Sequence, residues 1–375
     1  MNNNKTFITL LITALSFCGV ILYVATHRGT PVIDFEAYYT GATIVREGNV
    51  KKLYDVSTQK EARNKVIDRV PRNGLLAYRN PPLLAYLLAP LSNLDFDYAY
   101  VSFISLTLLS FCIFCYMLYK KGFLQSNSDI LTLFLYLPVI HSIMIGQVAP
   151  ILLLCVASSV FLIQKGRYRL AGFIMTSLLF KPQRFLLGLI FLLFVKNKSQ
   201  YAQGLLIGFV MFAFLNVLID PSLIYKMPQF LVATQNMSNG TDLADSYSIQ
   251  SIVKFIFPAI NDTENLKITI FVSILGLVSY TAYILKKGVK NIEEGIISAI
   301  PISLLLGVHT MPADYVLVAL PLIMLKKWGE RVVLLILICT PWLGFIKHTS
   351  WLIVVIHGAV LIAVLAKNTK IKARA

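Results

Sequence analysis

The chain has 375 residues, of which 57% are hydrophobic and only 14% are charged. Such a balance argues against a water-soluble enzyme and is typical of a chain whose helices face lipid and one another. The formal net charge of +16 does not indicate a nucleic-acid partner, because the basic residues form short clusters between apolar runs instead of one patch on a soluble domain.

Long apolar runs follow one another along the whole chain. A helix needs about 20 residues to cross roughly 30 Å of hydrocarbon, and about twelve runs approach that length. We therefore predict an all-α polytopic membrane protein, a single integral membrane domain over residues 1–375. The short runs 168–181 and 184–195 form either two spans with polar ends or one re-entrant hairpin. The predicted spans lie at about 6–26, 97–119, 129–146, 148–164, 168–181, 184–195, 201–219, 268–285, 295–308, 314–325, 331–346 and 350–366.

The basic clusters predict the orientation of these spans. With the N-terminus in the cytoplasm, the inside connections hold most of the Lys and Arg residues, as the positive-inside rule requires. Both termini are then cytoplasmic, and two long segments, 27–96 and 220–267, lie outside. The first run is expected to be retained as an anchor, because it is too long for a usual signal peptide and no clear cleavage site precedes Asp34. The inside clusters are Lys120 and Lys121; Lys165, Arg167 and Arg169; Lys196 and Lys198; Lys286, Lys287 and Lys290; Lys326, Lys327 and Arg331; and Lys367, Lys370, Lys372 and Arg374.

The first outer segment opens with the stretch IDFEAYY at residues 33–39. From Phe35 the pattern predicts an amphipathic helix to about Glu47, ended by Gly48 and Asn49. Asp34 is then the helix N-cap. A carboxylate at the mouth of a membrane cavity can also accept a proton with its second oxygen, so the structural and the catalytic interpretations both stay open.

A second part of this segment reads AYRNPPLLAYLLAPL, from Ala77 to Leu91. The two prolines in its middle set a rigid turn before an apolar run that is too short to span a membrane. We expect a short helix in the membrane interface, with Tyr78 and Arg79 at headgroup depth. An interfacial anchor with structural prolines is the alternative.

Three further polar clusters are predicted at the same outer face: Gly146–Gln147, Lys181–Arg184 and GVHTMPADY at 307–315. Basic residues on the side that the positive-inside rule disfavours need a reason, and an anionic ligand at the outer face supplies one. Lys181 and Arg184 snorkelling to the interface is the alternative. His309 and Asp314 also fit a purely structural pair at a helix end.

Several motifs are missing from the sequence. It has no GxxxxGK[ST] loop, GxGxxG fingerprint, HExxH helix, GxSxG elbow or Cys/His cluster of metal-ligand spacing. ATP-driven transport, dinucleotide chemistry, zinc proteolysis and serine hydrolysis therefore lose support. We predict no cofactor and no metal site. The remaining candidates for catalytic groups are carboxylates, a histidine and cations at one face.

Four stretches in this order resemble glycosyltransferase family 87, a GT-C type family of membrane enzymes: DFEAYYTGATIVREGNVKKLYD (34–55), YRNPPLLAYLLAPL (78–91), LLFKPQ (178–183) and HTMPADY (309–315). The resemblance implies a polyprenyl-phosphate-linked sugar donor, such as the mannose donor, a glycolipid or glycan acceptor and a bacterial inner membrane. It also implies an essential aspartate in the first outer loop, which falls on Asp34. The paired acids of better-known GT-C enzymes are absent, and Asp34-x-Glu36 is the nearest match.

Sugar transfer from a polyprenyl phosphate needs a base for the acceptor hydroxyl and positive charge for the leaving phosphate. We predict Asp34 as the base, with Glu36 the weaker candidate. His309 either contacts the phosphate or orients Asp34. The tyrosines either contact sugar or pack. The remaining predicted binding residues are Arg79, Lys181 and Arg184 for the phosphate, Tyr38, Tyr39 and Tyr78 for the sugar, and Gln147 and Gln183 as further polar contacts.

Two other classes of protein fit about twelve spans. A secondary transporter or flippase-like protein should show two similar halves or charges at mid-membrane depth. No internal repeat is visible, and the polar residues concentrate at one face. A lipid-binding scaffold subunit is the third class. Both rivals predict that Asp34→Asn has a mild effect.

Overall fold

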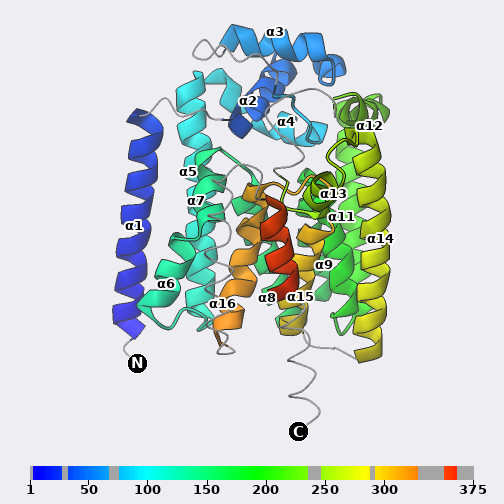
Figure 1. The fold of residues 1–375 in the computed structure, drawn as a ribbon. Helices are drawn as coiled ribbons and strands as arrows, with labels where there is room; N and C mark the ends of the chain where they lie inside the picture. The colour runs from blue at the N-terminus through cyan, green and yellow to red at the C-terminus, as the bar shows by residue number, and fades with distance from the viewer. Residues whose placement is uncertain are drawn as a thin grey trace.

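The computed structural model describes residues 3–27, 33–66, 76–234, 246–287, 292–327 and 350–360. All regular secondary structure within these ranges is helical. The predicted all-α class is therefore confirmed for the described part of the chain. Most of the longer helices run side by side as a bundle, and several short helices lie across one end of it (Figure 1).

Four described helices are long and apolar enough to cross a membrane: α1 (Asn3–His27), α5 (Phe96–Lys120), α11 (Lys198–Ile219) and α14 (Asp262–Lys287). A fifth candidate is the pair α6 (Asn127–Phe134) and α7 (Leu137–Met144), which is bent by 44°. The length and apolar composition of these helices identify the chain as a membrane protein. They do not establish twelve spans.

The other predicted spans coincide with shorter helices. The predicted span 331–346 lies outside the described residues. In the segment 168–195 the chain forms a series of short helices whose middle carries Lys181. The shorter helices are α8 (Ala149–Gln164), α9 (Tyr168–Met175), η3 (Thr176–Phe180), η4 (Pro182–Arg184), α10 (Phe185–Ile190), η5 (Phe191–Leu193), α15 (Ile292–Leu305), η7 (Pro312–Val318), α16 (Ala319–Lys327) and a helix over Ser350–Val360.

The outer surface of the bundle is apolar, as lipid contact requires. Leu206 and Phe214 on α11 are exposed, and so are Phe271 and Leu275 on α14. In contrast, α8 lies inside the bundle and buries most of its side chains. Because large apolar side chains face outward on several helices, the surrounding solvent that suits this chain is hydrocarbon rather than water.

The predicted first outer segment forms the layer of short helices at the end of the bundle (Figure 1). It contains α2 (Ile33–Arg46), α3 (Val56–Val66), α4 (Pro82–Leu88) and η2 (Ala89–Asn93). The helix predicted from Phe35 is confirmed, but residues 35–45 are all buried, so it does not have the exposed polar face of an amphipathic helix. The predicted short helix is also confirmed and begins at Pro82. Helix α3 was not predicted, although Asp55 signals its start by accepting a hydrogen bond from the backbone N–H of Thr58 at 2.7 Å.

Helix α2 is fixed within this layer by three side chains. Glu36 forms an ion pair with Arg63 of α3, the hydroxyl of Tyr39 donates to the carbonyl of Leu94 at 2.7 Å, and Arg46 donates to a carbonyl of η2. Glu36 therefore turns away from the bundle toward α3, as expected from its position two residues after Asp34.

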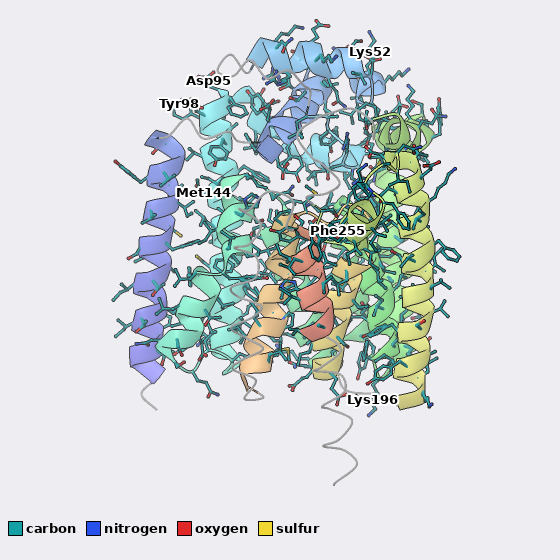
Figure 2. The ribbon with its side chains drawn as sticks, viewed as in Figure 1. Lys52, Asp95, Tyr98, Met144, Lys196 and Phe255 are labelled. Atoms are coloured by element: carbon teal, nitrogen blue, oxygen red, sulfur yellow. The ribbon has the colours of Figure 1, made fainter. Side chains whose placement is uncertain are left out.

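The second predicted outer segment adds α12 (Leu223–Ala233) and α13 (Ile249–Ile256) near the same end of the bundle (Figure 1). Lys52, in the first of these segments, lies at this end, whereas Lys196, in a predicted inside connection, lies at the opposite end (Figure 2). The start of α1 and the end of α16 are also at that opposite end. The layer of short helices and these basic connections are therefore separated by the length of the bundle.

Candidate active site

Asp34 lies in the first turn of α2, because the helix begins at Ile33. The prediction of Asp34 as the N-cap is therefore wrong, because the helix begins two residues before the predicted start at Phe35. Its carboxylate instead reaches the turn between α7 and α8, where Oδ2 accepts a hydrogen bond from Nε2 of Gln147 at 2.5 Å. The backbone N–H of Phe35 donates to the carbonyl of Ile145 at 3.1 Å. A free N–H group at the start of α2 is thus paired with the end of α7.

The end of α7 presents Gln147 to this helix. Gly146 has a φ of 69°, and the N–H groups of Gly146 and Gln147 close the helix end onto the carbonyls of Ile143 and Ser142 at 3.0 and 2.9 Å. The side-chain Oε1 of Gln147 then accepts from the hydroxyl of Tyr38 at 2.8 Å. With its oxygen on the phenol, the amide directs its NH₂ group at Asp34. The Oδ1 atom of Asp34 has no hydrogen bond to another described residue.

Gly146→Ala is expected to separate α2 from α7. A β-carbon on Gly146 would lie 2.6 Å from Cβ of Phe35, and the positive φ strains any other residue. The expected cost is about 1–3 kcal/mol of stability, with loss of most activity. Gly166→Ala is the control, because Gly166 has a similar φ of 73° with nothing within 4 Å of an added β-carbon. Thermal melting that shows equal losses for the two variants would refute the docking contact.

A buried ion cluster joins the Lys181–Arg184 turn to η7. Nζ of Lys181 donates to Oδ1 of Asp314 at 2.6 Å, and Nη2 of Arg184 donates to Oδ2 at 3.1 Å. The exposed fractions of the three residues are only 6%, 1% and 2%. Nη2 of Arg184 also donates to the hydroxyl of Thr310 at 2.9 Å. Two cations share one carboxylate, so the cluster keeps one net positive charge.

Arg184 reaches this cluster because Gly307 has no side chain. A β-carbon on Gly307 would lie 2.7 Å from Nη1 of Arg184. Both cations are predicted from the sequence, but Asp314 as their shared partner is not. The available signal was that Asp314 is the acidic residue of the cluster at 307–315, opposite a turn that holds two basic residues.

Asp34 lies close enough to this cluster to respond to its charges. Burial raises the pKa of Asp34 above the ordinary carboxyl value, while the hydrogen bond from Gln147 and the positive charge of Lys181 oppose the rise and the charge of Asp314 adds to it. The net direction is upward. A carboxylate with a raised pKa is a better proton acceptor, provided that it is ionised at the working pH.

His309 lies beside the same cations. Its backbone has a φ of 52°, its N–H donates to Oε1 of Gln250 at 3.2 Å and its carbonyl accepts from Arg184 at 3.4 Å. Burial lowers the pKa of its imidazole to about 4, and the charges of Arg79 and Arg184 add to this effect. The imidazole is therefore neutral at pH 7. No hydrogen bond joins His309 to Asp34 among the described residues.

The other predicted site residues occupy different positions. Arg79 donates through Nη2 to the carbonyl of Thr234 at 2.6 Å. The hydroxyl of Tyr39 donates to the carbonyl of Leu94, as described above. Tyr78 is fully buried, and its hydroxyl donates to the carbonyl of Pro81 at 2.6 Å. Of the three tyrosines, only Tyr38 hydrogen-bonds to Gln147, the partner of Asp34. Gln183 is half-buried and makes no side-chain hydrogen bond within the described part of the chain.

The structure therefore gathers most of the residues predicted at the outer face into two groups. Asp34, Tyr38 and Gln147 form one hydrogen-bonded group, and Lys181 and Arg184 form the second with Asp314. His309 and Arg79 lie next to the second group. Such a carboxylate, with one oxygen that no described residue occupies and a buried positive charge nearby, can deprotonate a hydroxyl near an anionic leaving group.

Comparison with protein families assigns the chain to one family. The model of Glycosyltransferase family 87 matches residues 78–306, which is more than half of the chain. Searches of curated proteins and of solved structures found no match. The matched region contains Gln147, Lys181 and Arg184, whereas Asp34 precedes it and Asp314 follows it. The resemblance seen in the sequence is thus confirmed, and the chain belongs to glycosyltransferase family 87.

Proposed function

We propose that this glycosyltransferase moves a hexose, mannose in the first instance, from a polyprenyl-phosphate-linked donor to a hydroxyl of a glycolipid or glycan. The reaction takes place at the extracytoplasmic face of a GT-C type bundle of about twelve spans, in a bacterial inner membrane with both chain termini in the cytoplasm. The observation that carries the proposal is the position of Asp34. One of its carboxylate oxygens has no hydrogen-bond partner among the described residues, and it lies near the Lys181–Arg184–Asp314 cluster.

In the proposed reaction Asp34 acts as the general base. Its Oδ1 takes the proton of the acceptor hydroxyl while the hydroxyl oxygen forms a bond to C1 of the sugar. The bond between C1 and the phosphate oxygen breaks, and the electron pair leaves with the polyprenyl phosphate. Attack from the face opposite the phosphate inverts the configuration at C1. Gln147 holds the other carboxylate oxygen, so Oδ1 is kept for the acceptor.

The leaving phosphate gains negative charge as the bond to C1 breaks. Buried cations stabilise such charge strongly, because they act in a region from which water is excluded. Lys181, Arg184 and Arg79 are the proposed source of this stabilisation. Neutral His309 serves as a hydrogen-bonding group rather than as a cation.

The donor class tests the proposal. Purified protein in nanodiscs is offered labelled mannose on polyprenyl phosphate or on a nucleoside diphosphate, together with a lipid extract of the host. Transfer from the lipid donor alone is the expected result. Transfer from the nucleotide donor alone would overturn the proposal.

The pH dependence of the transfer rate should follow the ionisation of the Asp34 carboxyl group. Gln147→Leu removes a hydrogen bond that stabilises the ionised carboxylate, so the pKa of Asp34 rises further. The base must be ionised, and the acid limb of the rate profile should therefore move to higher pH while the KM for the donor changes little. His309, with a pKa of about 4, should add no limb between about pH 5 and 8. An unmoved acid limb in Gln147→Leu would refute this role of Gln147.

A further inference from the structure

Several buried nitrogen atoms have no hydrogen-bond partner among the described residues. They are Nε of Arg79, Nε and Nη1 of Arg184 and Nε2 of Gln250. Each of these atoms is a donor only. Buried donors without acceptors are rare in folded proteins because each loses its bonds to water and gains nothing in return. The group therefore indicates that an acceptor belongs in this place.

Two of the three side chains contact His309, and the third lies near it. Gln250 accepts from the N–H of His309 at 3.2 Å, and Arg184 donates to its carbonyl at 3.4 Å. Arg79 is near enough for its positive charge to lower the pKa of the imidazole. The donors come from three distant parts of the chain, which makes their meeting point a feature of the fold rather than of a local turn.

Gln250 is held rigidly at this point. It lies on α13 and is fully buried, and its backbone carbonyl accepts from Nδ2 of Asn265 at 3.2 Å. Because Oε1 is already occupied by the N–H of His309, the side-chain NH₂ group cannot exchange places with it without losing that bond. The unpartnered Nε2 is thus presented in a fixed direction.

We infer that Gln250 is a ligand-binding residue and that it forms, with Arg79 and Arg184, a cradle for a phosphate-type anion beside His309. A phosphate offers several acceptor oxygens, and these could accept hydrogen bonds from the unpartnered nitrogen atoms of the three side chains. Asp314 occupies Nη2 of Arg184 and Nζ of Lys181, so it leaves the other donors without an acceptor.

The inference rests on the proposed function in one respect, namely that the anion is the phosphate of the lipid-linked donor. Free phosphate and the head group of an anionic phospholipid share the same chemistry. The binding experiment therefore uses three probes: polyprenyl phosphate, inorganic phosphate and phosphatidylglycerol. The full-length protein is held in phosphatidylcholine nanodiscs, and both affinity and thermal melting are measured.

Gln250→Glu is the decisive variant. Its carboxylate keeps an oxygen for the N–H of His309 and supplies a second oxygen to the nearby guanidinium groups. Without ligand, this variant should melt at a higher temperature than the wild type. It should also bind polyprenyl phosphate at least roughly tenfold more weakly, as expected for a lost hydrogen bond to a charged group and added repulsion. Gln200→Glu, at the exposed start of α11, is the matched control and should change neither quantity.

Gln250→Leu covers the case in which the glutamate variant does not fold. This variant lacks the donor without adding charge, and we expect severalfold weaker binding of polyprenyl phosphate. Unchanged affinity in either variant would overturn the inference. Equal loss for inorganic phosphate and polyprenyl phosphate supports a site for the phosphate group itself, whereas loss for phosphatidylglycerol alone would overturn the assignment to the donor.

These outcomes are separate from those of the proposed function. A wild type that binds polyprenyl phosphate through Gln250 but transfers no sugar keeps the cradle and refutes the glycosyl transfer. A wild type that transfers sugar normally, with no effect of Gln250→Glu on binding or on the KM for the donor, refutes the cradle alone.

Discussion

Asp34→Asn is expected to lower the rate of sugar transfer by about 10²–10⁴-fold, the usual effect of losing a general base. The asparagine side chain has nearly the same shape and still hydrogen-bonds to Gln147, so α2 should stay docked on α7. It cannot take a proton from the acceptor hydroxyl. Transfer is measured with wild type and variant in nanodiscs, and melting temperature reports whether both are folded.

The control for this variant is Asp95→Asn. Asp95 is an exposed acid at the same end of the molecule (Figure 2), and its side chain does not cap α5. We expect this change to leave the rate of transfer within twofold of the wild type. Full transfer activity in Asp34→Asn would remove Asp34 from catalysis. Absence of transfer by both proteins, with other donor sugars and acceptors also tried, would favour a transporter or a scaffold.

Asp314→Asn is expected to cause the largest loss of stability. The substitution leaves Lys181 and Arg184 buried without a counter-ion, and removing one partner of a buried ion pair costs about 3–5 kcal/mol. Binding of a phosphate ligand should restore part of this loss, because the ligand supplies the missing negative charge. Melting temperature is measured with and without polyprenyl phosphate.

Lys181→Met separates charge balance from simple loss of contacts. This variant leaves Arg184 and Asp314 as a neutral pair at 3.1 Å, so its loss of stability should be clearly smaller than that of Asp314→Asn. It should nevertheless lower the rate of transfer, since a cation near the leaving phosphate is gone. A stability loss as large as that of Asp314→Asn would show that the cluster is not organised by charge.

The helical class and the grouping of polar residues could be predicted from the sequence, for two physical reasons. Apolar runs of membrane length mark helices directly. The order of the runs, with the positive-inside rule, assigns each connection to a side, which grouped Asp34 with Gln147, Lys181 and His309 before any contact was known.

The individual contacts could not be predicted in the same way. Gln147 meets Asp34 across 113 positions of sequence, and such pairing depends on how α2 docks against α7. For Tyr39 and Tyr78 the sequence leaves open sugar contact or packing, and it could not predict that their hydroxyls bond to backbone carbonyls of the short-helix layer. Gln250 carries no sequence signal, since a lone glutamine is common and only its unpartnered buried nitrogen marks it.

The most direct test of the account measures both products of one reaction. Wild-type protein in nanodiscs receives polyprenyl-phosphate-mannose, labelled in the sugar, and a lipid extract of the host. The account predicts that each labelled mannose transferred to an acceptor is matched by one released polyprenyl phosphate. Movement of intact donor from one leaflet to the other in vesicles, with no polyprenyl phosphate released, would contradict it and identify a flippase.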